Sequence, residues 1–430
     1  MGFSSLEGFD ANGKTVLVRA DLNAPVREGV VQDSRRFQEA AETVKWLVKR
    51  GAKVVVLAHQ GRPGDADFLS LSQHAVLLSK HVRKKVKFLD ELFSERALAE
   101  VRKLGNGRVL LLENTRFYAE ETLETAGGGG GKAFAETLFV KALAGVADAF
   151  VNEAFSVSHR AQASVVGFPE LLPSYAGLCF EREFKAREKA MGVASGKGVV
   201  AGGREGSGEA GCKPVVWVLG GGKPVDCLKL LENAVASDSG VGKVLVGGVI
   251  GDLCLKAKGF SLGLKEEWLA KQGFPSLVER VSKALDKAGD KVVAPADLAF
   301  ADADGVREEV PVEKAGSASG VVMDVGGRTA KAFADVVKSA GVVYFKGPLG
   351  AFEQPAFETG TRVVLKALES CKGFTLVGGG HSLDALEKFG VNKKKIGHVS
   401  SSGGALLAFL LGEELPGLKA LERSSSLAGA

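Results

Sequence analysis

The 430-residue sequence has no paired cysteine motif, because its five cysteines stand far apart and none lies in a C-x-x-C spacing. An odd, dispersed set of this kind argues against a disulfide framework or a zinc site, and it is typical of reduced thiols in a cytoplasmic protein. The N-terminal stretch, Met-Gly-Phe-Ser-Ser-Leu-Glu-Gly, has neither the basic nor the apolar region of a signal peptide. No apolar run approaches the length of a membrane span. We therefore expect a cytoplasmic protein without a membrane partner.

The sequence also has little net charge. Its 56 basic and 51 acidic side chains leave a formal charge of +5, which is too small to argue for nucleic acid or a membrane surface as a partner. Hydrophobic residues make up 45% of the chain and charged residues 25%, a globular composition that argues against wholesale disorder. A chain of this length is too long for one comfortable core, so we expect two domains.

Two common catalytic patterns are missing. No Ser-His-Asp or Cys-His arrangement indicates a covalent nucleophile. No G-x-G-x-x-G opens a helix with an acidic residue about twenty positions later, which argues against a nicotinamide-dependent dehydrogenase. The residues present in place of these motifs are arginines in the first half of the chain and glycines in the second.

Short β-branched runs alternate with longer amphipathic stretches along the whole chain, a pattern that predicts parallel sheets wrapped by helices. We expect an α/β protein with two doubly wound, Rossmann-like parallel-sheet domains joined by a hinge helix. Ligands of such sheets bind beyond the carboxyl ends of the strands. The expected strands are Thr15–Val18, Val54–Leu57, Val109–Leu112 and Ala149–Asn152 in the first half, and Val215–Leu219, Val244–Val246, Val292–Ala294, Val342–Phe345 and Thr375–Val377 in the second.

The domain division is expected near the proline-containing stretch Phe168–Tyr175, which a charged helical segment follows. We expect an N-terminal domain at 1–174, a hinge helix at 175–192, a C-terminal domain at 193–400, and a segment at 401–430 that returns to the N-terminal domain. Gly127–Gly131 and Val193–Gly211 are interpreted as mobile surface insertions. The five glycines lack the preceding strand and the following Lys-Ser/Thr of a phosphate-binding loop.

The two halves carry different motifs after their apolar runs. Arginine forks bind small, multiply charged anions, and glycine lets the backbone approach a phosphate or a flat base. The first half would therefore hold an anionic substrate and the second a nucleotide. The motifs are V-R-A-D-L-N at 18–23, A-H-Q-G-R-P at 58–63, E-N-T-R-F at 113–117 and S-H-R at 158–160, followed by L-G-G-G-K at 219–223, V-G-G at 246–248, K-G-P-L-G at 346–350 and V-G-G-G-H at 377–381.

In this order and spacing the motifs resemble those of the phosphoglycerate kinase family, and most closely its archaeal-type branch, from about Gly8 to Leu418. The resemblance implies reversible phosphoryl transfer between 1,3-bisphosphoglycerate and ADP, giving 3-phosphoglycerate and ATP in glycolysis and gluconeogenesis. It also implies Mg²⁺ as the metal and direct in-line transfer on domain closure. An acyl phosphate is already activated, so the reaction requires alignment and positive charge rather than a general base.

The resemblance also implies the site residues. Arg36 would reach the reacting phosphoryl group and Lys223 would contact it during transfer, so these two are the expected catalytic residues. The phosphoglycerate site would consist of Asp21, Asn23, Arg36, His59, Arg62, Arg116 and Arg160. The nucleotide site would consist of Gly221, Gly222, Lys223, Gly247, Gly248, Lys346, Gly347, Glu353 on the ribose, Gly378, Gly379, Gly380 and Gly403.

Four positions depart from the common family motifs. Cys227 stands where many relatives have a second lysine, and Lys346 replaces the usual asparagine of the N-G-P loop. We hypothesise that the Lys346 charge offsets the one missing at Cys227. His381 stands where an aspartate is usual, which leaves the metal ligands open, and Ser402 replaces a glycine.

Several alternatives stay open at this stage. A non-catalytic relative that binds phosphoglycerate but has an altered nucleotide site is the alternative function, and both a monomer and a homodimer are compatible with the sequence. Asp226 and Asp297 could each be magnesium ligands or helix caps, and His59 and His159 could each be ligands or core histidines. We expect His74 and His81 at the surface, and Trp46, Trp217 and Trp268 in the core.

Overall fold

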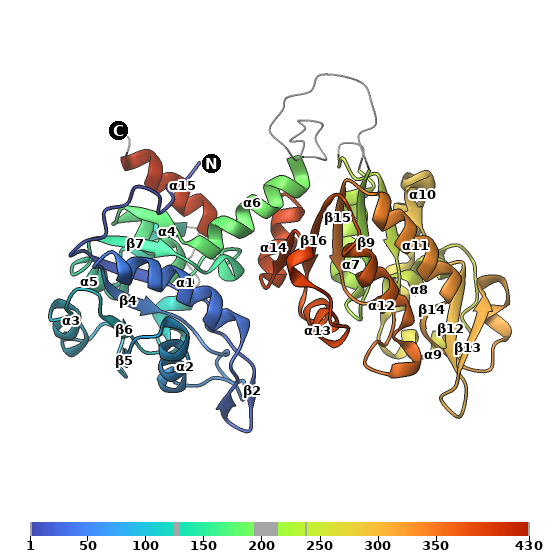
Figure 1. Ribbon diagram of the computed structural model, residues 1–430, viewed down its shortest axis with the longest axis horizontal. Coiled ribbons are helices and arrows are strands. Elements are labelled where there is room, and N and C mark those ends of the chain that lie inside the picture. Colours follow the sequence, from blue (N-terminus) through green and yellow to red (C-terminus); the bar gives the residue numbers. More distant parts are fainter. Residues whose placement is uncertain (1, 124–129, 193–213, 237–238, 429–430) are drawn as a thin grey trace, which may run out of the picture. The chain divides into compact units, whose positions relative to one another are not determined.

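The computed structural model describes residues 2–123, 130–192, 214–236 and 239–428. They form two compact units (Figure 1). The first comprises Met1–Phe184 and Gly412–Ala430, and the second comprises Lys185–Leu411. The chain passes between the units twice, once inside helix α6 (Leu178–Gly192), within the segment 175–192 expected as the hinge, and once between Leu411 and Gly412.

A six-stranded parallel sheet forms the centre of the first unit, in the order β5-β6-β4-β1-β7-β8. The four expected strands are all present, and the two that were not expected, β5 and β8, are three-residue strands at the edges. Central strands are buried on both faces, as a parallel sheet covered by helices requires. The strands are β1 (Thr15–Arg19), β4 (Lys53–Leu57), β5 (Val86–Phe88), β6 (Val109–Leu111), β7 (Ala149–Asn152) and β8 (Ser174–Ala176).

Helices cover both faces of this sheet. Because side chains alternate along a strand, Val16 and Val18 join a core with α1 and α2, whereas Leu17 joins a core with α3, α4 and α5. Gly130 and Gly131, expected in a mobile insertion, begin α4, and Gly127–Gly129 lie outside the described residues. The helices are α1 (Arg35–Lys49), α2 (Ser72–Val82), α3 (Glu95–Arg102), α4 (Gly130–Ala135), α5 (Leu138–Ala144) and α15 (Pro416–Ala428).

The second unit repeats the plan with a parallel sheet in the order β11-β10-β9-β15-β16-β17. One face packs on α7, α8, α10 and α14, and the other on α11, α12 and α13. The expected insertion Val193–Gly211 lies outside the described residues. The strands are β9 (Val215–Leu219), β10 (Lys243–Val246), β11 (Val292–Val293), β15 (Val342–Lys346), β16 (Phe374–Gly378) and β17 (His398–Ser400), and the helices are α7 (Pro224–Ala234), α8 (Gly248–Ala257), α9 (Lys265–Lys271), α10 (Val278–Ala288), α11 (Gly327–Ser339), α12 (Thr359–Leu368), α13 (Gly380–Lys388) and α14 (Gly403–Leu410).

Two antiparallel elements were not expected from the sequence. The second unit contains a three-stranded sheet of β13 (Arg307–Pro311), β12 (Asp297–Ala301) and β14 (Val321–Val325), and the first contains a short hairpin of β2 (Val26–Arg27) and β3 (Val30–Val31). Strand β13 reads Arg-Glu-Glu-Val-Pro, which lacks the apolar run that indicates a buried strand. Across the described residues, no helix is both long enough and apolar enough to cross a membrane. The expected α/β class with two parallel sheets is confirmed.

Candidate functional site

The carboxyl ends of four strands in the first unit carry arginine or histidine. Arg19 ends β1, His59 follows β4, Arg116 lies in the 3-10 helix Thr115–Phe117 after β6, and Arg160 follows the 3-10 helix Phe155–Val157 after β7. Because these strands are parallel neighbours, their carboxyl ends meet at one edge of the sheet. The four motifs, which are far apart in the sequence, therefore lie together on one surface.

His59 shows that these side chains converge. Burial holds the pKa of its imidazole well below the usual value, and the nearby charges of Arg19, Arg116, Arg36 and Arg160 lower it further. Four guanidinium groups thus act on one histidine. An imidazole in this field stays neutral, so we exclude a charged His59 near neutral pH.

Arg19 decides which nitrogen of His59 carries the proton. Its Nη2 lies 3.1 Å from His59 Nδ1, and a guanidinium can only donate. Nδ1 therefore accepts, and the proton of the neutral ring is on Nε2. No residue in the described part of the chain is recorded as bonding this Nε2–H, which leaves a donor for a ligand.

A buried ion pair supports this arrangement and was not anticipated. Arg19 Nη2 lies 3.8 Å from Glu121 Oε1, and both side chains are fully buried. Ser164 connects them, because its hydroxyl accepts from Arg19 Nε at 2.7 Å and donates to Glu121 at 2.6 Å. A charged residue inside the apolar run V-L-V-R-A was the sequence signal for this group.

Asp21 and Asn23 have partners within the first unit. Asp21 Oδ2 forms an ion pair with Arg36 and accepts from Ser156. Asn23 Oδ1 accepts from the amide of Gly61 at 2.9 Å. These contacts tie the loop after β1 to α1 and to the loop after β4.

The remaining arginines leave a surplus of positive charge. Burial lowers the pKa of Arg116 to about 10, and the charges of Arg19, Arg160 and Arg62 contribute to that shift. Burial and the charge of Arg62 also lower the pKa of Arg160. Five arginines gather here, whereas only Glu121 and Asp21 are recorded as ion-paired with them in the described residues. Such a surface, named here the arginine cluster (Arg19, Arg36, His59, Arg62, Arg116, Arg160), is built to bind a polyanion.

His74 and Gln60 lie behind the arginine cluster. His74 was expected at the surface, and this prediction is wrong: its side chain is fully buried on α2, and Nε2 lies 3.0 Å from Gln60 Oε1. Burial lowers the pKa of His74 to about 4. The apolar side of α2 includes His74 because Ala75 and Leu78 pack on the same core.

Glycine loops interlock at the carboxyl ends of the second sheet. The amides of Gly220, Gly221 and Gly248 donate to the carbonyls of Lys346, Pro348 and Leu349 at 2.7, 2.6 and 2.9 Å. Gly347 has φ +87°, and a Cβ there would lie 2.2 Å from the Gly220 carbonyl oxygen. Only glycine allows this close crossing of two backbones.

Two cavities open beside these loops and share the wall residues Gly221, Gly222, Pro348 and His381. One has a volume of about 390 Å³ and is named here the base cavity. The other has a volume of about 250 Å³ and is named here the phosphate cavity. Their common wall means that one elongated ligand can occupy both.

The phosphate cavity is suited to anions. Residues at the amino ends of α7, α13 and α14 line it, and so do Lys223 and Lys346. Amino ends of helices present free amides and a positive dipole end to an anion. Lys346 Nζ is buried, has no hydrogen-bond partner among the described residues, and lies 3.4 Å from Asp226 Oδ2.

The four departures from the family motifs all lie at the phosphate cavity or next to it. Cys227 is buried and its thiol donates to the Gly220 carbonyl at 3.2 Å. Burial raises the pKa of this thiol to about 11, although the Lys346 charge opposes the rise. His381 lines both cavities, and Ser402 precedes Gly403 as the N-cap of α14.

The base cavity has apolar walls with a few polar groups. Val249, Leu298 and Met323 are among its apolar lining residues, and Glu353 is one of its polar lining residues. Trp268 also lines this cavity and keeps 37% of its surface exposed. The prediction that Trp268 belongs to the core is therefore wrong. Trp217 is buried as expected, and Trp46 is only partly buried, with the Arg50 guanidinium 3.7 Å from its ring centre.

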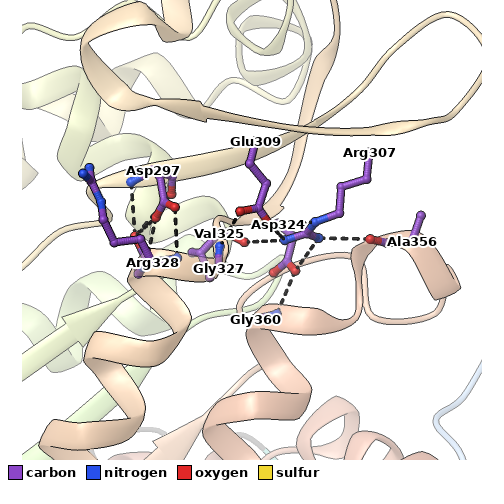
Figure 2. Close-up of polar contacts among 10 residues, drawn as sticks. Asp297, Arg307, Glu309, Asp324, Val325, Gly327, Arg328, Ala356 and Gly360 are labelled. Atoms are coloured by element: carbon purple, nitrogen blue, oxygen red, sulfur yellow. Dashed lines mark hydrogen bonds and ion pairs between the residues drawn. The ribbon is translucent and has the colours of Figure 1, made fainter.

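Asp297 acts as a helix cap in this structure (Figure 2). Its carboxylate accepts from the amides of Arg328 and Thr329 at 3.0 and 2.8 Å, at the start of α11. Both oxygens are thus engaged by the helix. Of the two interpretations left open for Asp297, the structure supports capping.

Two of the expected nucleotide residues do not line either cavity. A Cβ on Gly247 would lie 2.6 Å from Leu349 Cδ2, and one on Gly378 would lie 2.8 Å from Leu406 Cδ2. These glycines therefore allow close packing behind the loops. The other expected nucleotide residues line one or both cavities, and they are Gly221, Gly222, Lys223, Gly248, Lys346, Gly347, Glu353, Gly379, Gly380 and Gly403.

One α/β unit carries the arginine cluster and the other carries two glycine-lined cavities. This combination is typical of a kinase that acts on a small anionic metabolite. The comparison with family models specifies which kinase: the phosphoglycerate kinase model matches residues 6–413. The chain belongs to the phosphoglycerate kinase family, so the expected family, enzyme class and fold are confirmed.

Individual relatives agree with this assignment. The chain is 39% identical to phosphoglycerate kinase of Halorubrum lacusprofundi over 98% of both chains, and 36% identical to that of Methanothermobacter thermautotrophicus over 98% and 97%. The crystal structure of the Pyrococcus horikoshii enzyme has a TM-score of 0.84 at 33% identity, covering 98% of this chain and 99% of that one. The Coxiella burnetii structure has a TM-score of 0.77 at 30% identity, covering 98% and 100%. None of these relatives supports the non-catalytic alternative.

Proposed function

We propose that this member of the family binds the phosphoglycerate at its arginine cluster and the adenine nucleotide in its two cavities. The reaction is reversible phosphoryl transfer between 1,3-bisphosphoglycerate and ADP, giving 3-phosphoglycerate and ATP. The observation that carries this proposal is the surplus of guanidinium groups around the neutral His59. A carboxylate and phosphates would neutralise that surplus.

Arg19 orients His59, and the other members of the arginine cluster bind the substrate in this proposal. Arg62, Arg116 and Arg160 bind the outer phosphate through paired N–H groups. The Nε2–H of His59 donates to a substrate oxygen. Arg36, held by Asp21, reaches the phosphoryl group that is transferred.

The two cavities match the parts of a nucleotide. The base cavity takes the base between glycine backbone and apolar side chains, and Glu353 accepts hydrogen bonds from the ribose hydroxyls. The phosphate cavity takes the phosphates against the amino ends of α7, α13 and α14. Lys223 and Lys346 add positive charge, and Lys223 is exposed, which suits a side chain that follows a moving phosphoryl group.

Mg²⁺ fits the phosphate cavity through Asp226. This carboxylate lines the cavity and is 41% exposed. The ion is held in kinases by one or two carboxylates together with substrate phosphates and water, so a single protein carboxylate suffices. Bound there, Mg²⁺ would neutralise charge on the nucleotide phosphates.

Positioning and electrostatics account for catalysis. The acyl phosphate needs no general base, and the arginine and lysine groups stabilise charge on the three equatorial oxygens. The two proposed half-sites belong to different units, and the proposed transfer is direct and in line, on a domain closure that keeps water out. We place this activity in the cytoplasm, in a monomer or a homodimer.

A coupled assay with 3-phosphoglycerate and Mg-ATP tests the proposal. Arg116→Gln should raise the KM for 3-phosphoglycerate tenfold or more, because charged hydrogen bonds of this kind contribute about 1.5–3 kcal/mol, and should leave the KM for ATP within twofold. Arg102→Gln, at an exposed arginine at the end of α3, is the matched control. Nucleotide binding without turnover by the unmodified protein would instead favour the non-catalytic alternative.

A further inference from the structure

The base cavity contains a buried charge pair that the steps above do not use. Asp252 lies on α8, one turn after Gly248, and Lys265 begins α9. Both side chains line the cavity, and they are 6% and 13% exposed. Asp252 Oδ2 lies 3.7 Å from Lys265 Nζ, which is beyond hydrogen-bond distance.

Lys265 is held in place with bonding capacity to spare. Its ammonium donates to the Val322 carbonyl at 3.2 Å and lies 4.3 Å from the ring centre of Trp268. An ammonium has three donors, and only one of them is used in a hydrogen bond that the structure records. Trp268 therefore fixes the position of the charge without saturating it.

Asp252 is less satisfied than Lys265. Lys265 is the one ion-pair partner that the structure records for its carboxylate among the described residues, at 3.7 Å, and no shorter polar contact to it is recorded there. Burial raises the pKa of Asp252 to about 6. A carboxylate in this position lacks the hydrogen bonds that normally offset its loss of hydration.

Such a pair contributes little to folding. The cost of removing two charges from water is offset only when hydrogen bonds satisfy their remaining donors and acceptors. Here one acceptor and one donor stay open, side by side, on the wall of a cavity with otherwise mainly apolar walls. A ligand with a hydrogen-bond donor next to an acceptor could form a hydrogen bond with each of the two side chains.

We propose that Asp252 and Lys265 recognise the hydrogen-bonding edge of the purine base. Asp252 accepts from an amino or ring N–H group, and Lys265 donates to the neighbouring acceptor. In adenine these are the 6-amino group and N1, and in guanine they are the N1–H and 2-amino groups beside O6. The inference rests on the proposal that this cavity holds the base.

The test compares nucleotides that differ by one group. For the wild-type enzyme, kcat/KM is measured with ADP and with purine riboside 5′-diphosphate, which lacks the 6-amino group, and then with GDP and IDP, which differ by the 2-amino group. Adenine recognition predicts a preference of tenfold or more in the first pair, and guanine recognition predicts it in the second, since a hydrogen bond to a charged group is worth about that much. No preference in either pair overturns the proposal without any variant.

Asp252→Ser then assigns the preference to a residue. The ratio within the responsive pair should fall to near one. An equal loss for both members of that pair would show a purely structural role and would overturn the proposal. Asp335→Ser, at an exposed aspartate on α11, should leave the ratios unchanged.

Met323→Trp separates this inference from the proposed nucleotide site. Met323 is a half-buried residue on the wall of the base cavity, and the larger side chain would fill that cavity. The KM for every purine nucleotide should rise at least tenfold. If it stays unchanged, the base binds elsewhere and the proposed nucleotide site fails with it; if it rises while the Asp252 ratios do not respond, only the recognition by Asp252 and Lys265 is overturned.

Discussion

Arg307 and Asp324, a residue that lines the base cavity, form an ion pair, with Arg307 Nη1 3.1 Å from Asp324 Oδ2 (Figure 2). The same guanidinium donates to the carbonyls of Ala356 and Val325, each at 3.0 Å. Asp324 also accepts from the amide of Gly360 at 2.8 Å, at the start of α12. The pair therefore joins the antiparallel sheet to the segment that follows Glu353.

Replacement of Arg307 should destabilise the second unit. Arg307→Met leaves the buried Asp324 carboxylate without its charge partner, a loss of about 3 kcal/mol for a buried pair. Burial already raises the pKa of Asp324 to about 6, from an ordinary value near 3.8. Because Arg307 lowers this pKa, its removal should raise the pKa of Asp324 further, and the loss of stability relative to the wild type should grow as the pH rises above about 6. Urea unfolding at pH 5 and pH 8 measures the difference.

The control for this prediction is Arg328→Met. Arg328 also donates to a backbone carbonyl, that of Ala296 at 2.9 Å, but no ion pair with it is recorded among the described residues. A smaller effect, equal at both pH values, is expected. Equal losses for the two variants at pH 8 would contradict the assigned role of the Asp324 charge.

Lys346 should support nucleotide binding. In Lys346→Asn, which restores the common family residue, the phosphate cavity loses a buried cation 3.4 Å from Asp226, and the KM for ADP should rise about tenfold because charge-assisted contacts to phosphate are lost. The KM for 3-phosphoglycerate should change less than twofold. Steady-state kinetics with each substrate varied in turn provides the measurement.

A second substitution tests whether Lys346 replaces the charge missing at Cys227. Cys227 lines the same cavity, so Lys346→Asn combined with Cys227→Lys should recover part of the ADP affinity. Unchanged turnover and affinity in the single variant would refute the compensation hypothesis outright. Lys283→Asn, at an exposed lysine on α10, controls for the loss of net charge.

Arg19 should be essential for the stability of the first unit. Arg19→Met leaves Glu121 buried without its cation, and breaking a buried pair of this kind costs about 3–5 kcal/mol. The double variant Arg19→Met/Glu121→Gln should recover part of the loss, because no unpaired charge remains. A single variant as stable as the wild type in urea would contradict the assignment.

Glu153 should give the first unit a stability that depends on pH. Burial raises the pKa of its carboxyl to about 8, and its two oxygens both lie 3.1 Å from the amide of Cys179. The folded state keeps a proton that the unfolded state releases near pH 4.5. The contribution of Glu153 is thus fully present below pH 4.5 and is lost as the pH rises to about 8.

Glu153→Gln removes this titration and keeps the side-chain shape. Its Tm relative to that of the wild type should increase between pH 5 and pH 9. Glu7→Gln, at an exposed residue of the same unit, should show no such trend. If the difference in Tm between Glu153→Gln and the wild type is the same at every pH, the buried carboxyl does not titrate in this range.

The placement of Arg116, Arg160 and His59 near one another was predictable, because each follows an apolar run and parallel strands end at one edge. The Glu121–Arg19 pair was not predictable, since nothing local indicates that Glu121, in the 3-10 helix Ala119–Thr122, lies beside the end of β1. Trp268 and His74 were misplaced for a related reason. The residues around each of them predict a helix and its faces, but which face is buried depends on elements that are distant in the chain.

The sequence by itself determined the α/β class, the alternation of strands and helices, and the family, because these follow from periodicity and from ordered motifs. Only the tertiary structure decided that His59 carries its proton on Nε2, that Asp297 caps a helix, and that Asp252 and Lys265 face one cavity. The reason is physical: protonation, capping and recognition depend on distances between residues that are far apart in the chain, and only packing sets those distances.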